Sequence, residues 1–184
     1  MSASRGKIIV IDSVDMTGKT EIAHALAKAS GYTYFKNDAE RKEFGTGSNY
    51  FVNVLRYGLT YFLSFLRQSK QGVIFDRCYP SEYVYAKAFN RETDWEVLRE
   101  CDKEFARLGA VIIIPYRTSY EGIVDDSHPE LIDSKRLAEL ERFYHDFATW
   151  TTVPVFWLNV DDENLEREIR DITGFLAKQN GGDW

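Results

Sequence analysis

The chain has 184 residues, which is the size of a single domain with one sizeable hydrophobic core. Hydrophobic residues make up 44% of it and charged residues 28%, the ordinary balance of a soluble globular protein. The formal net charge of -6 argues against a protein built to bind duplex DNA, which would carry a basic stripe. A small anionic substrate remains compatible with this charge, because a few local cations can hold a phosphate.

Cysteine usage and the N-terminus both indicate a cytoplasmic protein. Cys78 and Cys101 form no CxxC pair and no histidine cluster accompanies them, so we expect reduced thiols and not a metal site. No apolar run reaches membrane-spanning length, and the short polar start, residues 1–7, does not resemble a signal peptide. We therefore expect no contact with a membrane.

Short apolar runs alternate with helical patterns along the chain. Strands are predicted at residues 8–11, 32–35, 73–75, 110–114 and 153–160, with Pro115 ending the fourth. Helices are predicted at residues 18–30, 49–71, 80–89, 95–108, 132–150 and 163–178, with Gly31 ending the first and Asp94 capping the fourth. This alternation predicts an α/β fold with a parallel sheet covered on both faces.

The predicted sheet also indicates where chemistry should occur. Ligands of such folds bind at the carboxyl ends of the strands, so the loops after the five strands are the candidate sites. No linker is long enough to divide the chain, and residues 1–184 are expected to form one domain.

A phosphate-binding loop (P-loop) follows the first predicted strand. The sequence Ser-Val-Asp-Met-Thr-Gly-Lys-Thr fits the P-loop pattern except that Ser13 replaces the first glycine, which is tolerable only if its backbone angles are not glycine-like. Backbone N–H groups of such a loop cradle phosphates, and the following helix adds partial positive charge. Lys19 is expected to neutralise the β- and γ-phosphates of ATP, and the Thr20 hydroxyl to bind Mg²⁺. The predicted ATP-binding residues are Ser13, Val14, Asp15, Met16, Thr17, Gly18, Lys19 and Thr20.

Asp76 and Arg77 follow directly on the third predicted strand. An acid at this edge of the sheet faces the P-loop and is suited to hold Mg²⁺, often through water. The arginine beside it offers a fork of donors to the phosphate that is attacked or transferred. Such a pair alone would be read as an ordinary ion pair. Beside a P-loop we interpret Asp76 as a metal ligand and Arg77 as catalytic.

Two segments resemble the thymidylate kinase family. Residues 11–15 and 18–20 are similar to that family's P-loop, which carries an aspartate inside the loop. Residues 76–81, with Tyr85 beyond them, are similar to its Asp-Arg motif and the serine and tyrosine that follow. The order of the predicted elements is similar over roughly the whole chain. This resemblance implies a P-loop kinase fold with three layers, α/β/α, and a five-stranded parallel sheet of order 2-3-1-4-5.

The resemblance also implies roles around an acceptor nucleotide. Asp15 would accept a hydrogen bond from the 3′-hydroxyl of its sugar, and Tyr85 would wall off the sugar and favour deoxyribose. On the aromatic-rich helix, Arg56 would read the base edge and Phe51 would stack on the base. Lys36, just after the second strand, would face the acceptor phosphate. The substrate-binding residues expected on this basis are Asp15, Lys36, Phe51, Arg56, Arg77, Ser81 and Tyr85.

The segment 117–136 stands where the family has a mobile lid over ATP, but it is shorter and more acidic than the family pattern. The family places a catalytic arginine in the P-loop or in the lid, and the P-loop position here holds Met16. Arg117, at the end of the fourth strand, is our candidate for this role, and Arg136 is the second. We interpret the remaining polar residues of the segment as solvated loop residues: Asp125, Asp126 and His128.

The predicted function is ATP- and Mg²⁺-dependent phosphorylation of a (deoxy)nucleoside 5′-monophosphate, most simply a pyrimidine such as dTMP or dUMP. Because this acceptor is already a phosphate anion, it requires no strong general base, and positioning with charge neutralisation carries the catalysis. The predicted catalytic residues are Lys19, Arg77, Arg117 and Asp15. The partner is then a small nucleotide, and the aromatic helix 49–71 is compatible with a homodimer.

Three alternatives stay open. A deoxynucleoside kinase would need a carboxylate after the second strand, where Asp38 is available, although Lys36 and Asp15 favour a monophosphate acceptor. A kinase of a modified base within DNA conflicts with the acidic charge. A nucleotide-binding module with little turnover is compatible with Ser13, Met16 and the short lid.

Overall fold

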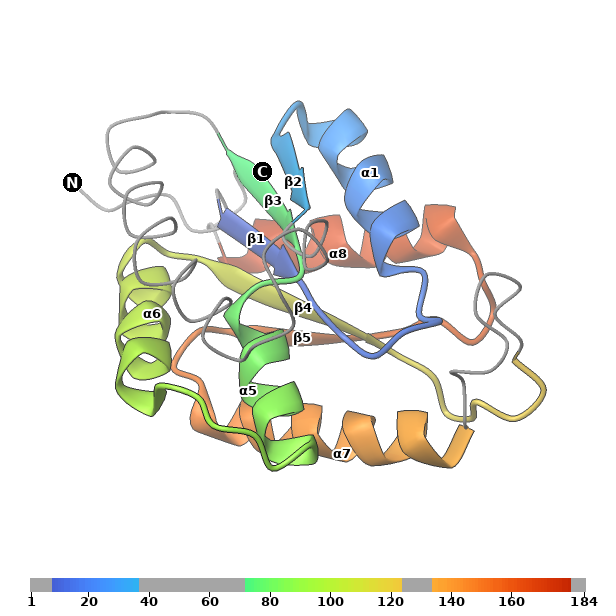
Figure 1. The fold of residues 1–184 in the computed structure, drawn as a ribbon. Helices are drawn as coiled ribbons and strands as arrows, with labels where there is room; N and C mark the ends of the chain where they lie inside the picture. Colours follow the sequence, from blue (N-terminus) through green and yellow to red (C-terminus); the bar gives the residue numbers. More distant parts are fainter. Residues whose placement is uncertain (1–7, 37–71, 124–133, 180–184) are drawn as a thin grey trace.

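The computed structural model of the chain describes residues 8–36, 72–123 and 134–179. Within these ranges five parallel strands form one sheet with the order β2-β3-β1-β4-β5 (Figure 1). The strands are β1 (Ile8–Ile11), β2 (Thr33–Lys36), β3 (Val73–Asp76), β4 (Val111–Tyr116) and β5 (Val155–Asn159). The described helices are α1 (Lys19–Ser30), α5 (Tyr79–Ala88), α6 (Trp95–Arg107), α7 (Ser134–Trp150) and α8 (Leu165–Gln179). The predicted fold class and strand order are confirmed.

Helices cover both faces of the sheet and make three layers (Figure 1). Successive side chains of a strand point to opposite faces, so β1 sends Ile9 and Ile11 to one face and Ile8 and Val10 to the other. The first pair packs under α1 and α8, and the second packs under α5, α6 and α7. All residues of β1 and β3 are buried, which explains why these strands are continuous apolar runs in the sequence.

The register of the strands brings several polar residues to one edge of the sheet. Ile11 pairs with Asp76 across β1 and β3, and Asp76 pairs with Lys36 across β3 and β2. The Arg77 N–H donates to the carbonyl of Ile11 at 2.9 Å, which continues the pairing by one residue. Asp12, Asp76, Arg77 and Lys36 therefore all lie at the carboxyl edge where the P-loop begins.

Of the three element boundaries that were assigned to a named residue, two are confirmed and one is wrong. Gly31 ends α1 with a φ of 70°, and the Asp94 side chain caps α6 by accepting from the Val97 N–H at 3.1 Å. Pro115 does not end the fourth strand, because β4 continues to Tyr116. The last register pair of β4 with β1 is at Ile113, so Pro115 pairs only with β5 and its missing N–H disturbs no central ladder.

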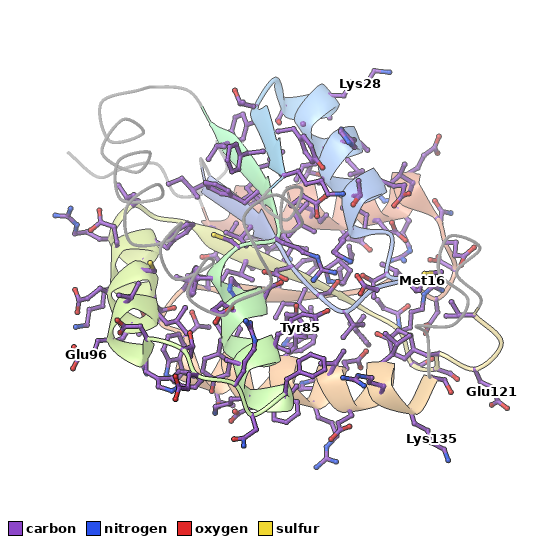
Figure 2. All side chains as sticks on the ribbon, in the orientation of Figure 1. Met16, Lys28, Tyr85, Glu96, Glu121 and Lys135 are labelled. Atoms are coloured by element: carbon purple, nitrogen blue, oxygen red, sulfur yellow. The ribbon has the colours of Figure 1, made fainter. Side chains whose placement is uncertain are left out.

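The outer surface of the described helices is charged. Lys28 on α1, Glu96 on α6 and Lys135 on α7 point away from the sheet toward solvent (Figure 2). In the part of the chain that the structure describes, none of the helices has the length and apolar character needed to cross a bilayer. The predicted helix 49–71 lies outside the described residues.

Candidate functional site

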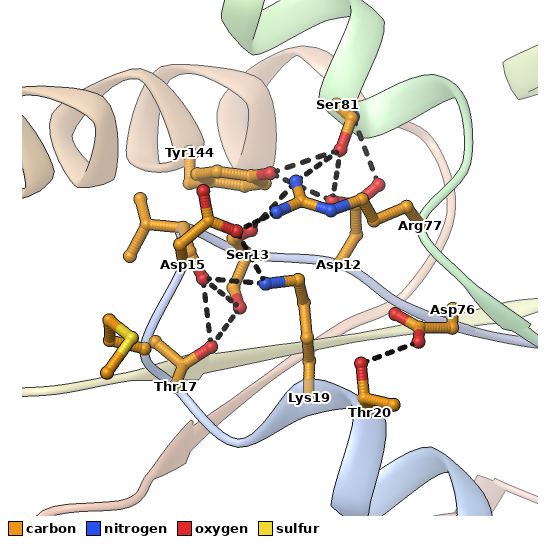
Figure 3. A network of polar contacts seen from close by, with 12 residues as sticks. Asp12, Ser13, Asp15, Thr17, Lys19, Thr20, Asp76, Arg77, Ser81 and Tyr144 are labelled. Carbon is orange, nitrogen blue, oxygen red and sulfur yellow. Dashed lines mark hydrogen bonds and ion pairs between the residues drawn. The ribbon is translucent and has the colours of Figure 1, made fainter. Parts of the chain in front are cut away.

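The loop between β1 and α1 is closed by contacts among its own residues (Figure 3). The Ser13 and Thr17 hydroxyls share a hydrogen bond of 2.5 Å, and the Thr17 hydroxyl lies 3.0 Å from the carbonyl of Val14. Left-handed backbone conformations fall on Met16 and Gly18, each with a φ of 67°, and not on Ser13. Ser13 thus meets the condition under which a serine can replace the first glycine of the pattern, and its hydroxyl helps to hold the loop.

Lys19, the first residue of α1, lies folded over the loop. Its Nζ donates to the carbonyl of Val14 at 3.2 Å and to Asp15 Oδ1 at 3.0 Å. Burial and the nearby positive charge of Arg77 lower the pKa of Lys19, and Asp15 opposes this shift. A phosphate in the loop would bring further negative charge to this buried ammonium, so Lys19 is well suited to bind one.

Asp76, the last residue of β3, faces the first turn of α1 (Figure 3). Thr20 Oγ1 donates to Asp76 Oδ2 at 2.8 Å, whereas Asp76 Oδ1 is buried and has no hydrogen-bond partner among the described residues. A buried carboxylate oxygen without a protein donor is free to contact a water molecule or a cation. The Thr20 hydroxyl gives its proton to Asp76, so its lone pairs can face a cation.

These two oxygens fit the predicted magnesium site. Mg²⁺ takes one or two protein oxygens and completes its octahedron with phosphate oxygens and water. Within the ranges 8–36, 72–123 and 134–179, no cluster of three or more His, Cys, Asp or Glu side chains is arranged to hold a metal by itself. Thr20 and Asp76 would therefore hold Mg²⁺ only together with a bound nucleotide.

Arg77 directly follows Asp76, and its side chain is directed at Asp15. Its Nη2 donates to Asp15 Oδ1, and its Nη1 donates to Ser81 Oγ at 3.2 Å and to the carbonyl of Ser13 at 3.4 Å. Burial opposes its charge, but Tyr85 and Asp15 raise the pKa of Arg77, so the guanidinium stays protonated. Arg77 adopts a left-handed backbone conformation with a φ of 66°, and such strain in a non-glycine residue is typical of functional sites.

Asp15 links the two cations of the loop. The same oxygen, Oδ1, accepts from Lys19 and from Arg77, although the side chain remains half exposed. Burial would raise the pKa of Asp15, but Arg77 and Lys19 together lower it. A phosphate bound by the loop would compete with Asp15 for both cations, which would leave this carboxylate available to a neighbouring hydroxyl group.

Asp12, the residue before the loop, is fully buried and accepts four hydrogen bonds (Figure 3). Its Oδ2 accepts from the backbone N–H groups of Cys78 and Ser81 at 2.9 and 3.0 Å. Its Oδ1 accepts from Ser81 Oγ at 2.6 Å and from the Tyr144 hydroxyl at 2.8 Å. Burial raises the pKa of Asp12, and the charge of Arg77 opposes the shift. Asp12 therefore ties the start of the loop to α5 and α7.

The sequence predicted that Ser81 contacts the substrate, but in this structure its hydroxyl contacts Asp12 and Arg77. Ser81 is 1% exposed, and its single hydroxyl proton is directed to Asp12. The lone pairs of Ser81 Oγ are then left to accept from Arg77 Nη1. The expected substrate contact stays a prediction, and in this geometry Ser81 supports Arg77.

Sequence reasoning missed Asp12 and Tyr144 as parts of the site. The available signal for Asp12 was an acid directly before the loop. Tyr144 stands among apolar residues at helical spacing, which indicated core packing alone.

A pocket of about 530 Å³ opens on the other side of the loop. Its wall is formed by the tip of the loop, the start of α1, the residue after β4, the segment between β5 and α8, and the start of α8. The lining residues are Met16, Thr17, Gly18, Lys19, Thr20, Glu21, Ile22, Arg117, Val160, Glu163, Leu165 and Glu168. Arg117 Nε donates to the carbonyl of Met16 at 2.8 Å, and its Nη2 pairs with Glu163 at 2.8 Å. Arg117 is thus fixed beside the P-loop, and Glu163 is a neighbour that the sequence did not indicate.

The other predicted residues fall into two groups. Tyr85 lies on α5, where its ring centroid is 5.8 Å from the guanidinium carbon of Arg77 (Figure 2). Lys36 is exposed at the end of β2, in register with Asp76, and the Arg136 guanidinium stacks over Phe89 at 4.4 Å. Six residues named from the sequence lie outside the described residues: Asp38, Phe51, Arg56, Asp125, Asp126 and His128.

Comparisons with known proteins show the fold. No protein-family model matches the sequence, and no match is found among curated proteins. Among solved structures, the chain is similar to the YorR protein of Bacillus subtilis in complex with phosphorylated GDP, with a TM-score of 0.67 and 16% identity over 96% of this chain and 99% of that one.

Two further solved structures belong to nucleoside and nucleotide kinases. Deoxyadenosine kinase from M. mycoides with bound dCTP has a TM-score of 0.56 and 18% identity, over 93% of this chain and 99% of that chain. Thymidylate kinase from Ehrlichia chaffeensis has a TM-score of 0.61 and 14% identity, over 92% of this chain and 97% of that chain. The chain therefore shares the fold of these solved structures.

Proposed function

We propose that the chain is an ATP- and Mg²⁺-dependent kinase of (deoxy)nucleoside 5′-monophosphates, with a pyrimidine such as dTMP or dUMP as the acceptor. The observation that carries the proposal is the convergence of three cations on one P-loop. Lys19 comes from α1, Arg77 follows β3 and Arg117 follows β4, and each contacts a residue of the loop. Phosphoryl transfer depends mainly on positioning and on neutralising charge, which such a set supplies.

The two sides of the loop fit two substrates. On one side, the pocket of about 530 Å³ beside Arg117 would take the sugar and base of ATP, while the loop and the start of α1 hold its phosphates. On the other side, Arg77 and Lys36 stand at the carboxyl edge of the sheet, where cations would hold the phosphate of a monophosphate acceptor. Asp15 beside them would accept from a sugar hydroxyl.

The chemistry follows from this placement. An oxygen of the acceptor phosphate attacks the γ-phosphorus of ATP in line, the bond between the γ-phosphorus and the bridging oxygen breaks, and ADP leaves. Lys19, Arg77 and Arg117 would neutralise the charge that spreads over the transferred group. Mg²⁺, when bound, would neutralise and orient the phosphates of ATP. No proton needs to be removed from a phosphate acceptor that is already ionised.

A second candidate is a deoxynucleoside kinase, and the likeness to deoxyadenosine kinase is the observation that favours it. That reaction needs a base for a 5′-hydroxyl, and Asp38 was the carboxylate that the sequence offered. Arg77 and Lys36 favour a phosphate acceptor over a hydroxyl.

A panel assay tests the proposal. Release of ADP would be followed with ATP, Mg²⁺ and each nucleoside and nucleoside monophosphate in turn, for the wild type and for Lys19→Ala. We expect turnover on a pyrimidine deoxynucleoside monophosphate that is lost in Lys19→Ala. Turnover on nucleosides alone would establish the second candidate. Binding of ATP without turnover on any of these acceptors would overturn the proposal.

A further inference from the structure

Asp76 is held by two hydroxyl groups that donate to the same oxygen. Thr20 Oγ1 and the Tyr34 hydroxyl each lie 2.8 Å from Asp76 Oδ2. The other oxygen, Oδ1, is buried and accepts from no group in the described ranges. Both hydroxyl donors therefore contact Oδ2, and Oδ1 is left for a ligand.

Tyr34 comes from β2, the strand next to β3, where Tyr34 pairs in register with Ile74, two residues before Asp76. Its ring stacks on the ring of His24, with centroids 4.0 Å apart and an angle of 26° between the planes. His24 lies one helical turn after Thr20 on α1. The two hydroxyl donors are thus carried by elements that also contact each other through this stack.

The consequence concerns rotation of the carboxylate. An aspartate can exchange its two oxygens by turning about its last side-chain bond, because the barrier around this sp³–sp² torsion is low. A full half-turn only exchanges two equivalent oxygens and restores the same contacts, but any smaller rotation moves the accepting oxygen away from its donors. With Thr20 alone such a rotation weakens one hydrogen bond, and with Tyr34 also in place it weakens two. The plane of the carboxylate is therefore fixed, with one oxygen held on the side away from both hydroxyls.

We infer that Tyr34 is a positioning residue for the metal site, which fixes Asp76 so that Oδ1 is presented to the Mg²⁺ of the bound nucleotide. This inference rests on the proposed function for the presence of Mg²⁺. It adds a residue of a predicted strand that the sequence did not assign to the site. Tyr34 itself touches neither metal nor phosphate, and it acts through Asp76.

The test measures metal binding without turnover. Mn²⁺ replaces Mg²⁺, and its affinity for the protein with ADP is followed by electron paramagnetic resonance. Tyr34→Phe removes one hydroxyl and keeps the ring that stacks on His24. We expect the Mn²⁺ affinity of the ADP complex to fall about five-fold, the effect of one hydrogen bond, with ADP affinity in EDTA unchanged.

Two further variants make the experiment specific. Tyr32→Phe removes a hydroxyl just before the same strand and should leave the Mn²⁺ affinity at the wild-type value. In an Asp76→Asn background, adding Tyr34→Phe should lower the Mn²⁺ affinity by much less than five-fold, because the carboxylate that it positions is gone.

Several outcomes separate the two proposals. Wild-type Mn²⁺ affinity in Tyr34→Phe, or an equal loss of ADP affinity in EDTA, would overturn the positioning role. If the wild type binds Mn²⁺ with ADP but transfers no phosphoryl group, the proposed function fails and the positioning role is judged by the Mn²⁺ data alone. If the wild type binds no nucleotide at all, both proposals are wrong.

Discussion

Asp12 and Asp76 stand at the carboxyl ends of adjacent strands and are 0% and 1% exposed, but their hydrogen bonding differs. Asp12 accepts four hydrogen bonds, two on each oxygen. Asp76 accepts two on Oδ2 and, within the described part of the chain, none on Oδ1. A carboxylate whose two oxygens both accept hydrogen bonds supports the structure around it. A carboxylate with one buried oxygen that accepts no hydrogen bond can bind a ligand through that oxygen.

The same contrast extends to the surroundings of the two aspartates. Asp12 joins β1 to α5 and α7 and thereby supports Ser81 and Arg77. Asp76 faces Thr20 in the first turn of α1. We therefore expect substitutions around Asp12 to act on folding and those around Asp76 to act on nucleotide and metal binding.

The largest effect is expected for Asp12→Ala. Removing this carboxylate leaves the N–H groups of Cys78 and Ser81 and the Tyr144 hydroxyl without their acceptor in a buried place. The free energy of unfolding should fall by about 4 kcal/mol, measured by urea denaturation. Glu96→Ala, on the exposed side of α6, is the control and should stay within about 0.5 kcal/mol of the wild type. A loss below about 1 kcal/mol for Asp12→Ala would remove the basis of the comparison.

Asp76→Asn should produce the opposite pattern. The Thr20 and Tyr34 hydroxyls would hold the amide oxygen in the place of Oδ2, which turns the NH₂ group toward the metal position. We expect kcat/KM to fall about 100-fold while urea denaturation stays close to that of the wild type. Raising the Mg²⁺ concentration should restore part of the activity. A variant that unfolds as readily as Asp12→Ala would show that Asp76 is structural as well.

Arg117→Ala addresses the pocket side of the loop. Its guanidinium contacts the carbonyl of Met16, so its loss should lower kcat about 10-fold or more with a smaller change in the KM for ATP. Glu163→Gln removes the partner of Arg117 but keeps the arginine, and it should change kcat little because Glu163 is exposed. Equal losses in the two variants would indicate that the ion pair, and not the arginine, matters.

The smallest effect is expected for Tyr144→Phe. The substitution removes one of the four donors to Asp12 and leaves the ring in the core. The free energy of unfolding should fall by about 1 kcal/mol, and the KM values should remain unchanged. A change in the KM for the acceptor at unchanged stability would place Tyr144 at the substrate, contrary to the comparison.

The sequence predicted the parts of this site that lie in contiguous segments. The P-loop and the Asp76–Arg77 pair each follow a buried strand directly, and parallel strands necessarily bring their carboxyl ends to one edge. The element order could be predicted from the alternation of apolar runs and helical patterns, whereas the strand order was implied by the resemblance to thymidylate kinases. Lys19, Thr20 and Asp76 could therefore be assigned to one site from the sequence.

Contacts between distant segments could not be predicted in this way. The hydrogen bond from Tyr144 to Asp12 joins residues 132 positions apart, and an aromatic residue at helical spacing carries no sign of such a partner. The Tyr34 hydroxyl reaches Asp76 only because β2 pairs with β3 in one particular register. Pro115 was misjudged because its effect depends on which neighbouring strand needs its N–H.

The most direct test of the central claim is a competition followed by ³¹P nuclear magnetic resonance. The enzyme would be given MgATP with equal concentrations of dTMP and thymidine, and in a second tube of dUMP and deoxyuridine. We expect ADP together with the β-phosphate resonance of a deoxynucleoside diphosphate in at least one tube, and no new monophosphate from the nucleoside. A new 5′-monophosphate without a diphosphate, or an unchanged ATP spectrum in both tubes, would contradict the central claim.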